Sequence, residues 1–336
     1  MSLLKAESRR LVKRRFTKLL VIGSVVVLIA IAVGIFLTNE KASPESIAKA
    51  KTQAAQELQQ AQRQAVQDKA TCEAAKGSAN AGQWPADCSA LYAPSEQDYD
   101  YHGFMPSTFE FVKNFAVMVT TLAAIFALMA FVMGASFVGA EWSSGAMMNL
   151  LLWRPQRLRV LGTKLIALVL GLTALTAVTL ALWTGLFWVL AMLRGNTDRM
   201  TSGAWQSLGL TELRALVLVL AAGALGFGLA SLGRHTAMAL GAAIGAVILL
   251  QFGLVTVLSL AKVKFAEAYL VPIWVRAWMD KSVNVKDYNS CDFSSTQGCT
   301  PPTLTITWEM AGSVVALVLV LVVGAAMWTM RSRDVA

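Results

Sequence analysis

Few side chains of this protein could take part in catalysis or bind a metal ion, and they do not form a catalytic motif. The only histidines are His102 and His235, and the four cysteines include no Cys-x-x-Cys pair, which disfavours a zinc site. The chain has no His-Glu-x-x-His or Gly-x-Ser-x-Gly sequence, and the Gly-Lys step of a phosphate-binding P-loop never occurs. We therefore expect no catalytic residue, no metal site and no cofactor in this chain itself.

One segment, residues 139–164, has an order of residue types that could serve a partner. Ser143 or Ser144 could cap a short helix over 146–153, and Pro155 would end that helix. The charged residues of the segment are Glu141, Arg154, Arg157, Arg159 and Lys164. A basic loop with an interfacial helix at a membrane surface would explain these residues, but such a loop needs only a few of them. This one holds an expected helix, a lone Glu141 and a basic turn bounded by Pro155.

The elements that would position this segment are long apolar runs. The chain has 336 residues, of which 56% are hydrophobic and only 15% charged, against about 25% charged in a soluble domain. A helix needs about 20 apolar residues to cross a bilayer. Six runs without Asp, Glu, Lys or Arg meet that length: 19–38, 115–137, 166–193, 215–232, 237–260 and 311–330. We predict an all-α membrane protein with six transmembrane helices.

The distribution of charge predicts the orientation of these spans. One side would carry the first 18 residues, the loop 138–165, the turn 233–236 and the C-terminal tail, with 14 basic and three acidic residues; the other side carries 14 basic and 17 acidic ones. The basic side of a plasma-membrane protein faces the cytoplasm, so both termini are expected there. The net charge of +9 then reflects topology and not nucleic-acid binding.

The chain divides accordingly into four parts. Residues 1–18 read as a cytoplasmic interfacial helix, and 19–38 as a first span that is an uncleaved anchor rather than a signal peptide. Residues 39–114 form an extracytoplasmic loop, with a helix from Pro44 to about Cys72 capped by Ser43. Residues 115–336 hold five further spans, the loop 138–165 and an outside loop 261–310, whose apolar stretch 265–278 is expected to be re-entrant or interfacial.

The cysteines agree with this topology, because all four lie in the extracytoplasmic loops, where disulfides persist. We favour the pairs Cys72–Cys88 and Cys291–Cys299, each of which closes a short local loop. A bridge that ties the two loops together is the alternative.

The loop resembles that of the permease subunits of ABC transporters of the type-2 exporter family. In that family a Glu, a Gly-Thr-Leu or similar step, a Leu-rich stretch, a Pro, a basic residue and a Lys join the second and third spans. The matching positions here are Glu141, Gly145-Ala146-Met147, 150–152, Pro155, Arg157 and Lys164. This chain departs from the pattern at two positions: Ala146 replaces the usual Thr, and Ser144 replaces a usual Arg.

The resemblance implies a function as well as a fold. The loop would form a coupling helix that docks on a separate cytoplasmic ATPase subunit, which would bind ATP and Mg. Glu141 and Arg157 would make polar contacts with that subunit, and the face 150–153 would enter a groove on it. The residues expected to serve this coupling are Glu141, Gly145, Leu150, Trp153, Pro155, Arg157, Arg159 and Lys164.

The expected partners are ABC ATPase subunits, a second permease copy or paralogue, and membrane lipids, without nucleic acid. An alternative function is a non-transporting membrane scaffold or sensor module with disulfide-stapled outside loops. A secondary transporter is disfavoured, because the apolar runs lack the ionisable groups of a proton relay.

Overall fold

The computed structural model describes residues 3–76, 81–85, 87–153, 156–198, 200–287 and 300–332. Within these residues, six helices are long and apolar enough to cross a membrane: Arg15–Thr38, Phe111–Ser143, Arg157–Arg194, Ser202–Gly233, Thr236–Leu260 and Trp308–Ser332. Each contains one of the predicted spans. The prediction of an all-α membrane protein with six spanning helices is confirmed.

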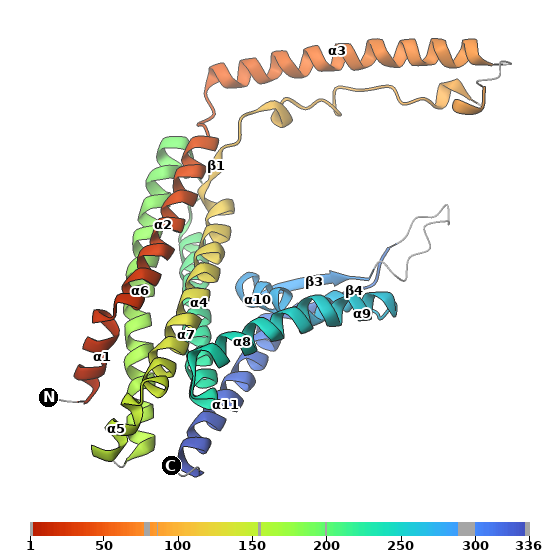
Figure 1. Cartoon of the computed structure of the whole chain (residues 1–336). Helices are drawn as coiled ribbons and strands as arrows, with labels where there is room; N and C mark the ends of the chain where they lie inside the picture. The colour runs from red at the N-terminus through yellow and green to blue at the C-terminus, as the bar shows by residue number, and fades with distance from the viewer. Residues whose placement is uncertain are drawn as a thin grey trace. The chain divides into compact units, whose positions relative to one another are not determined.

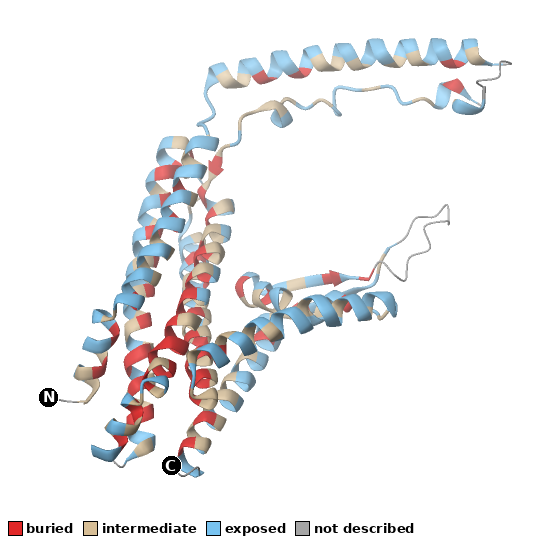
Figure 2. Cartoon of the chain, viewed as in Figure 1, coloured by how far each residue is buried: buried red, intermediate tan, exposed pale blue. Residues whose placement is uncertain are grey.

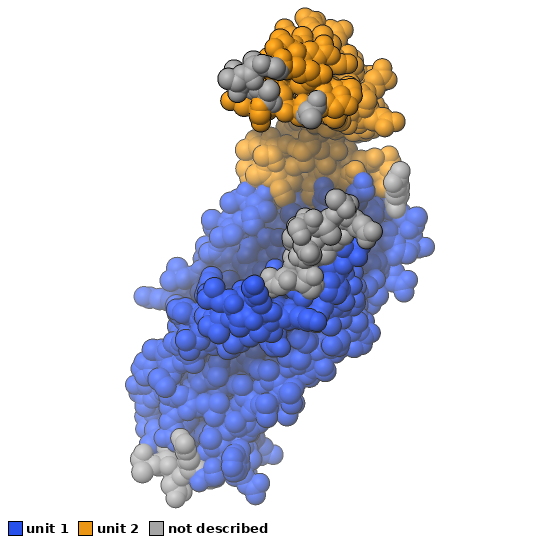
Figure 3. Space-filling model, turned by 90° about the vertical axis from the view of Figure 1, so that its right-hand side faces the viewer, with its two compact units in different colours: residues 1–31, 112–187, 199–336 blue, residues 32–111, 188–198 orange. Residues whose placement is uncertain are grey.

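The chain forms two compact units (Figure 3). Unit 1 comprises Met1–Ile31, Val112–Phe187 and Arg199–Ala336, and unit 2 comprises Ala32–Phe111 and Trp188–Asp198. The helices that cross from one unit to the other are α2 (Arg15–Thr38), α4 (Phe111–Ser143) and α6 (Arg157–Arg194). The remaining elements of unit 1 are α1 (Leu3–Lys13), α5 (Ala146–Trp153), α7 (Ser202–Gly233), α8 (Thr236–Ala246), η4 (Val247–Leu254), α9 (Val255–Leu260), η5 (Ala266–Tyr269), α10 (Val271–Asp280), β3 (Ser282–Lys286), β4 (Thr303–Thr307) and α11 (Trp308–Ser332).

The helices extend beyond the charge-free runs because polar residues continue the helix at the membrane surface. Helix α7, for example, starts at Ser202 and includes Glu212 and Arg214 before its apolar run begins. Glu212 accepts a hydrogen bond from the hydroxyl of Thr184 in α6. The sequence predicted an interfacial helix over residues 1–18 and a span from residue 19. In the structure, α1 ends at Lys13 and α2 begins at Arg15, so the boundary between the two helices lies earlier than predicted.

Buried residues of unit 1 lie mainly on α4, α6 and α7 (Figure 2), and α4 packs closely on α7. Gly134 faces the backbone of Gly223 so closely that a methyl group on it would lie 2.1 Å from the carbonyl oxygen. Gly226 faces the carbonyl oxygen of Phe131 at the same distance. Two reciprocal backbone contacts of this kind require glycine, since any side chain would separate the helices.

The fifth span differs from the other five because no residue of its most apolar window is buried. It consists of α8, the π-helix η4 and α9, and these elements diverge from α7 (Figure 1). Only the start of α8 is tightly packed: Ala239 joins Ala135 of α4 and Ala230 of α7 in a small buried cluster. The apolar surface of this span must therefore be covered by lipid or by another protein.

The loop 261–310 contains a hairpin that the sequence did not predict. Strands β3 and β4 pair antiparallel, with Ser282 opposite Thr307. Val285 and Ile306 pack under α10 against Ala277 and Ala311. The predicted re-entrant or interfacial segment corresponds to η5 and α10, which pack on the hairpin and on α11. The alternation of Thr with Leu and Ile in β4 is a strand signal that the prevailing helical pattern obscured.

Unit 2 is built around the long helix α3 (Pro44–Ala75). The predicted cap is confirmed: the Ser43 hydroxyl accepts the Ser46 N–H at 3.1 Å, and Ser46 Oγ accepts the Ser43 N–H at 2.9 Å. This capping box satisfies two otherwise free donors at the helix start. The other elements of unit 2 are η1 (Ala81–Gln83), η2 (Cys88–Ala90), η3 (Tyr101–Phe104), β1 (Phe109–Glu110) and β2 (Gly195–Asn196), and β1 pairs with β2 in parallel.

The predicted disulfide between Cys72 and Cys88 is confirmed, and both residues are buried. It ties the end of α3 to the returning chain across a sequence separation of 16. Cys291 and Cys299 lie outside the described residues, so their pairing stays a prediction.

Removing this disulfide should loosen the end of unit 2. Closing a loop of this length contributes about 3 kcal/mol by restricting the unfolded chain. In the double variant Cys72→Ser/Cys88→Ser, amide hydrogen exchange should therefore accelerate over the last turns of α3 and over η2. The variant Ser89→Ala, which leaves the bridge intact, serves as the control. Unchanged exchange in the double variant would show that the packing around Cys72 suffices without the bond.

Candidate functional site

The loop between α4 and α6 contains the short helix α5, which spans Ala146–Trp153 as predicted. Met147 and Leu151, one turn apart, point inward and are buried. Leu152 and Trp153 point outward, with 81% and 87% of their surface exposed. A large apolar pair left exposed at the end of an anchored helix is typical of a surface that another protein covers.

The turn from α4 into α5 depends on Gly145 and not on a serine cap. Gly145 has a φ of +71°, a left-handed conformation that costs other residues free energy. The hydroxyls of Ser143 and Ser144 donate to the carbonyls of Ala140 and Glu141 in α4. The expectation that one of these serines caps α5 is therefore wrong, because both complete the preceding helix instead.

The base of the loop is held by a buried ion cluster of Glu7, Glu141 and Lys164. The Nζ atom of Lys164 lies 2.7 Å from Glu7 Oε2, to which it donates a hydrogen bond, and 2.7 Å from Glu141 Oε2. The second contact is an ion pair without hydrogen-bond geometry. Lys164 is fully buried and Glu7 is 1% exposed, so one ammonium group lies between two carboxylates largely away from water, and the three charges sum to −1.

Two arginines of the N-terminal segment surround this cluster. The exposed guanidinium of Arg10 lies 3.6 Å from Glu7 Oε1 and 3.9 Å from Glu141 Oε1, and so offsets the second negative charge. Arg14 donates a hydrogen bond to the Ser136 carbonyl at 3.1 Å and lies over the ring of Phe137. The N-terminal segment is thus attached to the end of α4 as well as to α6.

A second close approach fixes the same end of α4 against the start of α8. A methyl group on Gly139 would lie 2.5 Å from the backbone nitrogen of Thr236, so only glycine fits there. Beside it, the guanidinium of Arg234 lies 5.1 Å from the centre of the Trp142 ring. The residues just before the loop are therefore held by α1, α6 and α8 together.

The remaining predicted coupling residues are distributed over both sides of the loop. Arg157 is partly buried and Arg159 is exposed at the start of α6, where Arg159 donates to Gln156 at 2.7 Å. Leu150 is partly buried on α5. Pro155 lies outside the described residues. The structure therefore brings Glu141 and Lys164 together, while it leaves Trp153 and Arg159 at the surface.

Glu7 was not among the predicted site residues. A signal for Glu7 was available, since it is the only acidic residue among the first 39 and it lies between basic ones. An acidic residue contributes little to an orientation signal, so its position among basic residues pointed to another role, such as an ion pair. Leu152 lies within the predicted face 150–153, but nothing in the sequence indicated that it would be exposed while Leu151 is buried.

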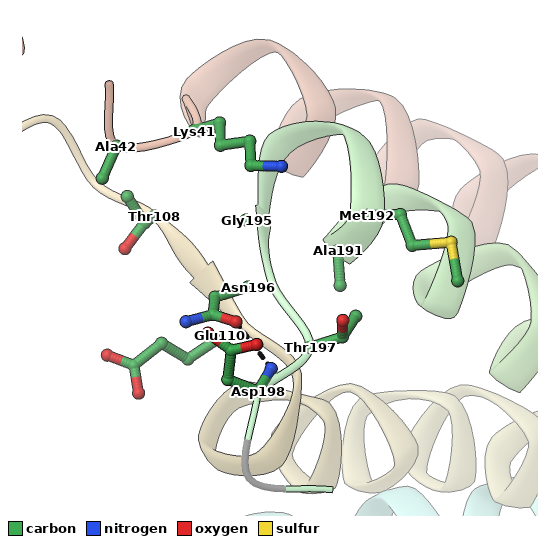
Figure 4. A pocket seen from close by; sticks show the side chains of 10 residues that line it. All are labelled: Lys41, Ala42, Thr108, Glu110, Ala191, Met192, Gly195, Asn196, Thr197 and Asp198. Atoms are coloured by element: carbon green, nitrogen blue, oxygen red, sulfur yellow. Dashed lines mark hydrogen bonds between the residues drawn. The ribbon is translucent and has the colours of Figure 1, made fainter. Parts of the chain in front are cut away.

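A polar pocket of about 460 Å³ lies within unit 2 (Figure 4). Lys41, Glu110 and Asp198 bring charges of both signs to its wall, and the Asp198 N–H donates to the Asn196 side chain at 2.6 Å. Its wall has no histidine or cysteine. No group of three metal-binding side chains occurs in the part of the chain that the structure describes. The pocket therefore suggests no catalytic chemistry, and α5 with its buried base is the candidate site.

Comparison with known proteins agrees with this geometry. A family model described as ABC-2 family transporter protein matches residues 1–334, which is nearly the whole chain. None of the curated proteins matches. The model covers all six spans and α5 together. This multi-pass membrane protein belongs to the ABC-2 transporter family, whose members form the membrane component of transport and are generally not catalytic themselves.

Proposed function

We propose that this chain is the permease subunit of an ATP-driven exporter and that it couples to a separate ATP-binding subunit through α5. The observation that carries the proposal is the pair of exposed apolar side chains, Leu152 and Trp153, on a helix anchored by buried residues. The chain lacks a P-loop, so ATP and Mg would be bound by the partner. Family membership favours this function over a scaffold or sensor.

In this proposal the predicted coupling residues act in two ways. Trp153 and its exposed neighbours contact the ATPase subunit directly, with Arg157 and Arg159 beside them. Glu141 and Lys164 are paired inside the chain, so they hold the base of the loop. Gly145 sets the angle at which α5 leaves α4 through its left-handed backbone. A docking surface of this kind transmits force because its own base is rigid.

The position of the basic residues supports an orientation of the chain in the membrane. Helices α1 and α5 and the last turns of α11 lie at one end of unit 1 (Figure 1). This end carries the basic residues of the first 18 positions and of the loop 138–165. We infer that it faces the cytoplasm, so that both termini are cytoplasmic and α5 is accessible to a soluble ATPase.

A second permease copy is proposed to cover part of the fifth span, with lipid over the rest. Gly241 and Gly245 of α8 have no atom within 4 Å of the position where a side chain would begin. Two glycines four residues apart allow close helix packing in a membrane. If the two copies meet there, cysteines introduced at these positions should form a cross-linked dimer in native membranes.

The proposal is tested by purifying the full chain from native membranes in a mild detergent. We expect a cytoplasmic ATPase subunit to co-purify with it and to hydrolyse ATP in the complex. A chain that purifies with non-ATPase partners alone, and does not respond to ATP and vanadate, would refute the proposed function and favour the scaffold. Chain purified alone from a host that lacks the partner genes provides the baseline.

A further inference from the structure

The buried ion cluster joins three segments that the sequence separates widely. Glu7 lies in α1, Glu141 lies near the end of α4, and Lys164 lies in the second turn of α6. Lys164 contacts both carboxylates at 2.7 Å. The two ends of the coupling loop (residues 138–165) are thus connected to each other and to the N-terminal helix through one ammonium group.

An orientation signal does not require this arrangement. The positive-inside rule depends on basic residues near the membrane surface, and acidic residues contribute little to it, so it gives no reason for a buried carboxylate among them. Burying a carboxylate or an ammonium group is costly unless a partner compensates the charge. Glu7 is 1% exposed and has its partner in α6. Its position is therefore explained by attachment of α1 to the loop.

Contacts outside the ion cluster also attach α1 and the residue that follows it to the same two helices. Leu11 packs against Gly171 of α6 so closely that a methyl group on this glycine would lie 2.7 Å from Leu11 Cδ2. Arg14 donates to the Ser136 carbonyl of α4. Helix α1 therefore touches α6 through both a buried charge and an apolar contact, and the chain beyond it is bonded to α4.

We propose that α1 is a third part of the coupling element and that Glu7, Glu141 and Lys164 are its positioning residues. When an ATPase subunit displaces α5, the ends of α4 and α6 and the whole of α1 then move as one rigid body. This inference rests on the proposed function for the source of the movement. The attachment of α1 through the ion cluster does not depend on any partner, so it is tested separately.

The first experiment uses the chain without a partner. A spin label on Arg9→Cys, at an exposed position of α1, reports how firmly that helix is held; Cys291 and Cys299 are replaced by serine throughout. Glu7→Gln should make the label several-fold more mobile, because it removes the charge that faces Lys164. Lys13→Gln and Arg159→Gln remove exposed charges from α1 and α6 and should leave the mobility unchanged. Equal mobility in Glu7→Gln and in these controls would overturn the proposal.

The second experiment asks whether α1 moves together with α6 in the complex. Distances are measured between labels on Arg9→Cys and Leu182→Cys of α6, without nucleotide and after trapping with ATP and vanadate. A reference pair on Asn149→Cys of α5 and Trp328→Cys of α11 reports the movement itself. We expect the reference distance to change and the α1–α6 distance to stay constant. A change in the α1–α6 distance that accompanies the reference change would overturn the inference.

The outcomes separate the two proposals. If no ATPase co-purifies and the reference pair never responds to nucleotide, the proposed function fails, while the first experiment still decides whether the cluster holds α1. In the assembled complex, Glu7→Gln should broaden the α1–α6 distances and make them nucleotide-dependent, with the amount of bound ATPase unchanged within about twofold. A role in folding alone would instead lower the amount of complex and leave the distances in the remaining complex as they were.

Two further variants distinguish a positioning role of the charges from a failure of the chain to fold. Lys164→Met alone leaves two carboxylates without their buried cation and should lower the yield of folded chain. The triple variant Glu7→Gln/Glu141→Gln/Lys164→Met has no uncompensated charge, so its yield should recover while α1 stays mobile. Recovery of both yield and firm attachment of α1 would show that the charges are dispensable and would overturn their positioning role.

Discussion

Replacing Trp153 by alanine is expected to weaken binding of the ATPase subunit by at least about 30-fold, which corresponds to about 2 kcal/mol. Trp153 is 87% exposed at the end of α5, where its ring contributes nothing to the packing of its own chain. Truncating an aromatic side chain at the centre of a docking surface removes the largest single share of the buried area. The measurement is the amount of ATPase retained on immobilised chain as its concentration is varied.

A second tryptophan provides the control for this variant. Trp328 of α11 is 71% exposed but lies on another helix, outside the proposed docking surface. Trp328→Ala should leave the affinity for the ATPase unchanged, and both variants should fold to the same extent. If the two substitutions weaken binding equally, or if neither does, α5 is not the docking helix. Leu152→Ser should weaken binding less than Trp153→Ala, because it removes a smaller apolar surface.

Replacing Gly134 by alanine is expected to disrupt unit 1, with a loss of about 3 kcal/mol or more in the free energy of unfolding. The added methyl group would lie 2.1 Å from the carbonyl oxygen of Gly223, which is backbone and cannot rotate away. Helices α4 and α7 would have to separate, and the packing of Gly226 on Phe131 would be lost with it. The measurement is unfolding of the detergent-solubilised chain, followed by tryptophan fluorescence.

Gly185 of α6 is the matched control for this substitution. It lies in an apolar helix like Gly134, but no atom is within 4 Å of its potential side chain. Gly185→Ala should be neutral or should stabilise the chain by up to about 1 kcal/mol, because alanine favours a helix over glycine. A stability loss in Gly134→Ala no larger than in Gly185→Ala would show that α4 and α7 do not cross as closely as the structure has them.

Local features of the chain sufficed to predict much of this protein. The six spans follow from long runs without charge, and the bounds of α5 were predicted correctly with Pro155 as its end, although the serine cap expected at its start was wrong. The cap at Ser43 and the bridge between Cys72 and Cys88 were equally accessible, since each joins residues that are near in sequence. The family resemblance rested on the order of residues within one loop, which is also a local property.

The features that the sequence did not predict depend on contacts between segments that are distant in the sequence or could pair in more than one way. Nothing near Gly134 in the sequence distinguishes it from Gly185, yet one touches a neighbouring backbone and the other touches nothing. The hydroxyls of the two serines before Gly145 could have bonded to the backbone of α5 or of α4. In the structure both donate to carbonyl groups of α4. The hairpin of β3 and β4 joins strands separated by more than a dozen residues, so its pairing was not visible in either strand alone.

Hydropathy, helix limits and short loops are properties of consecutive residues. The sequence by itself therefore determined the six membrane spans, the capped helix that starts at Pro44 and the short helix within the basic loop 138–165. Only the tertiary structure brought Glu7 to Lys164, 157 residues away, and turned Leu152 outward while Leu151 was buried. The physical reason is that burial and charge pairing are set by the packing of whole helices, whose rotation about their own axes a uniformly apolar sequence leaves open.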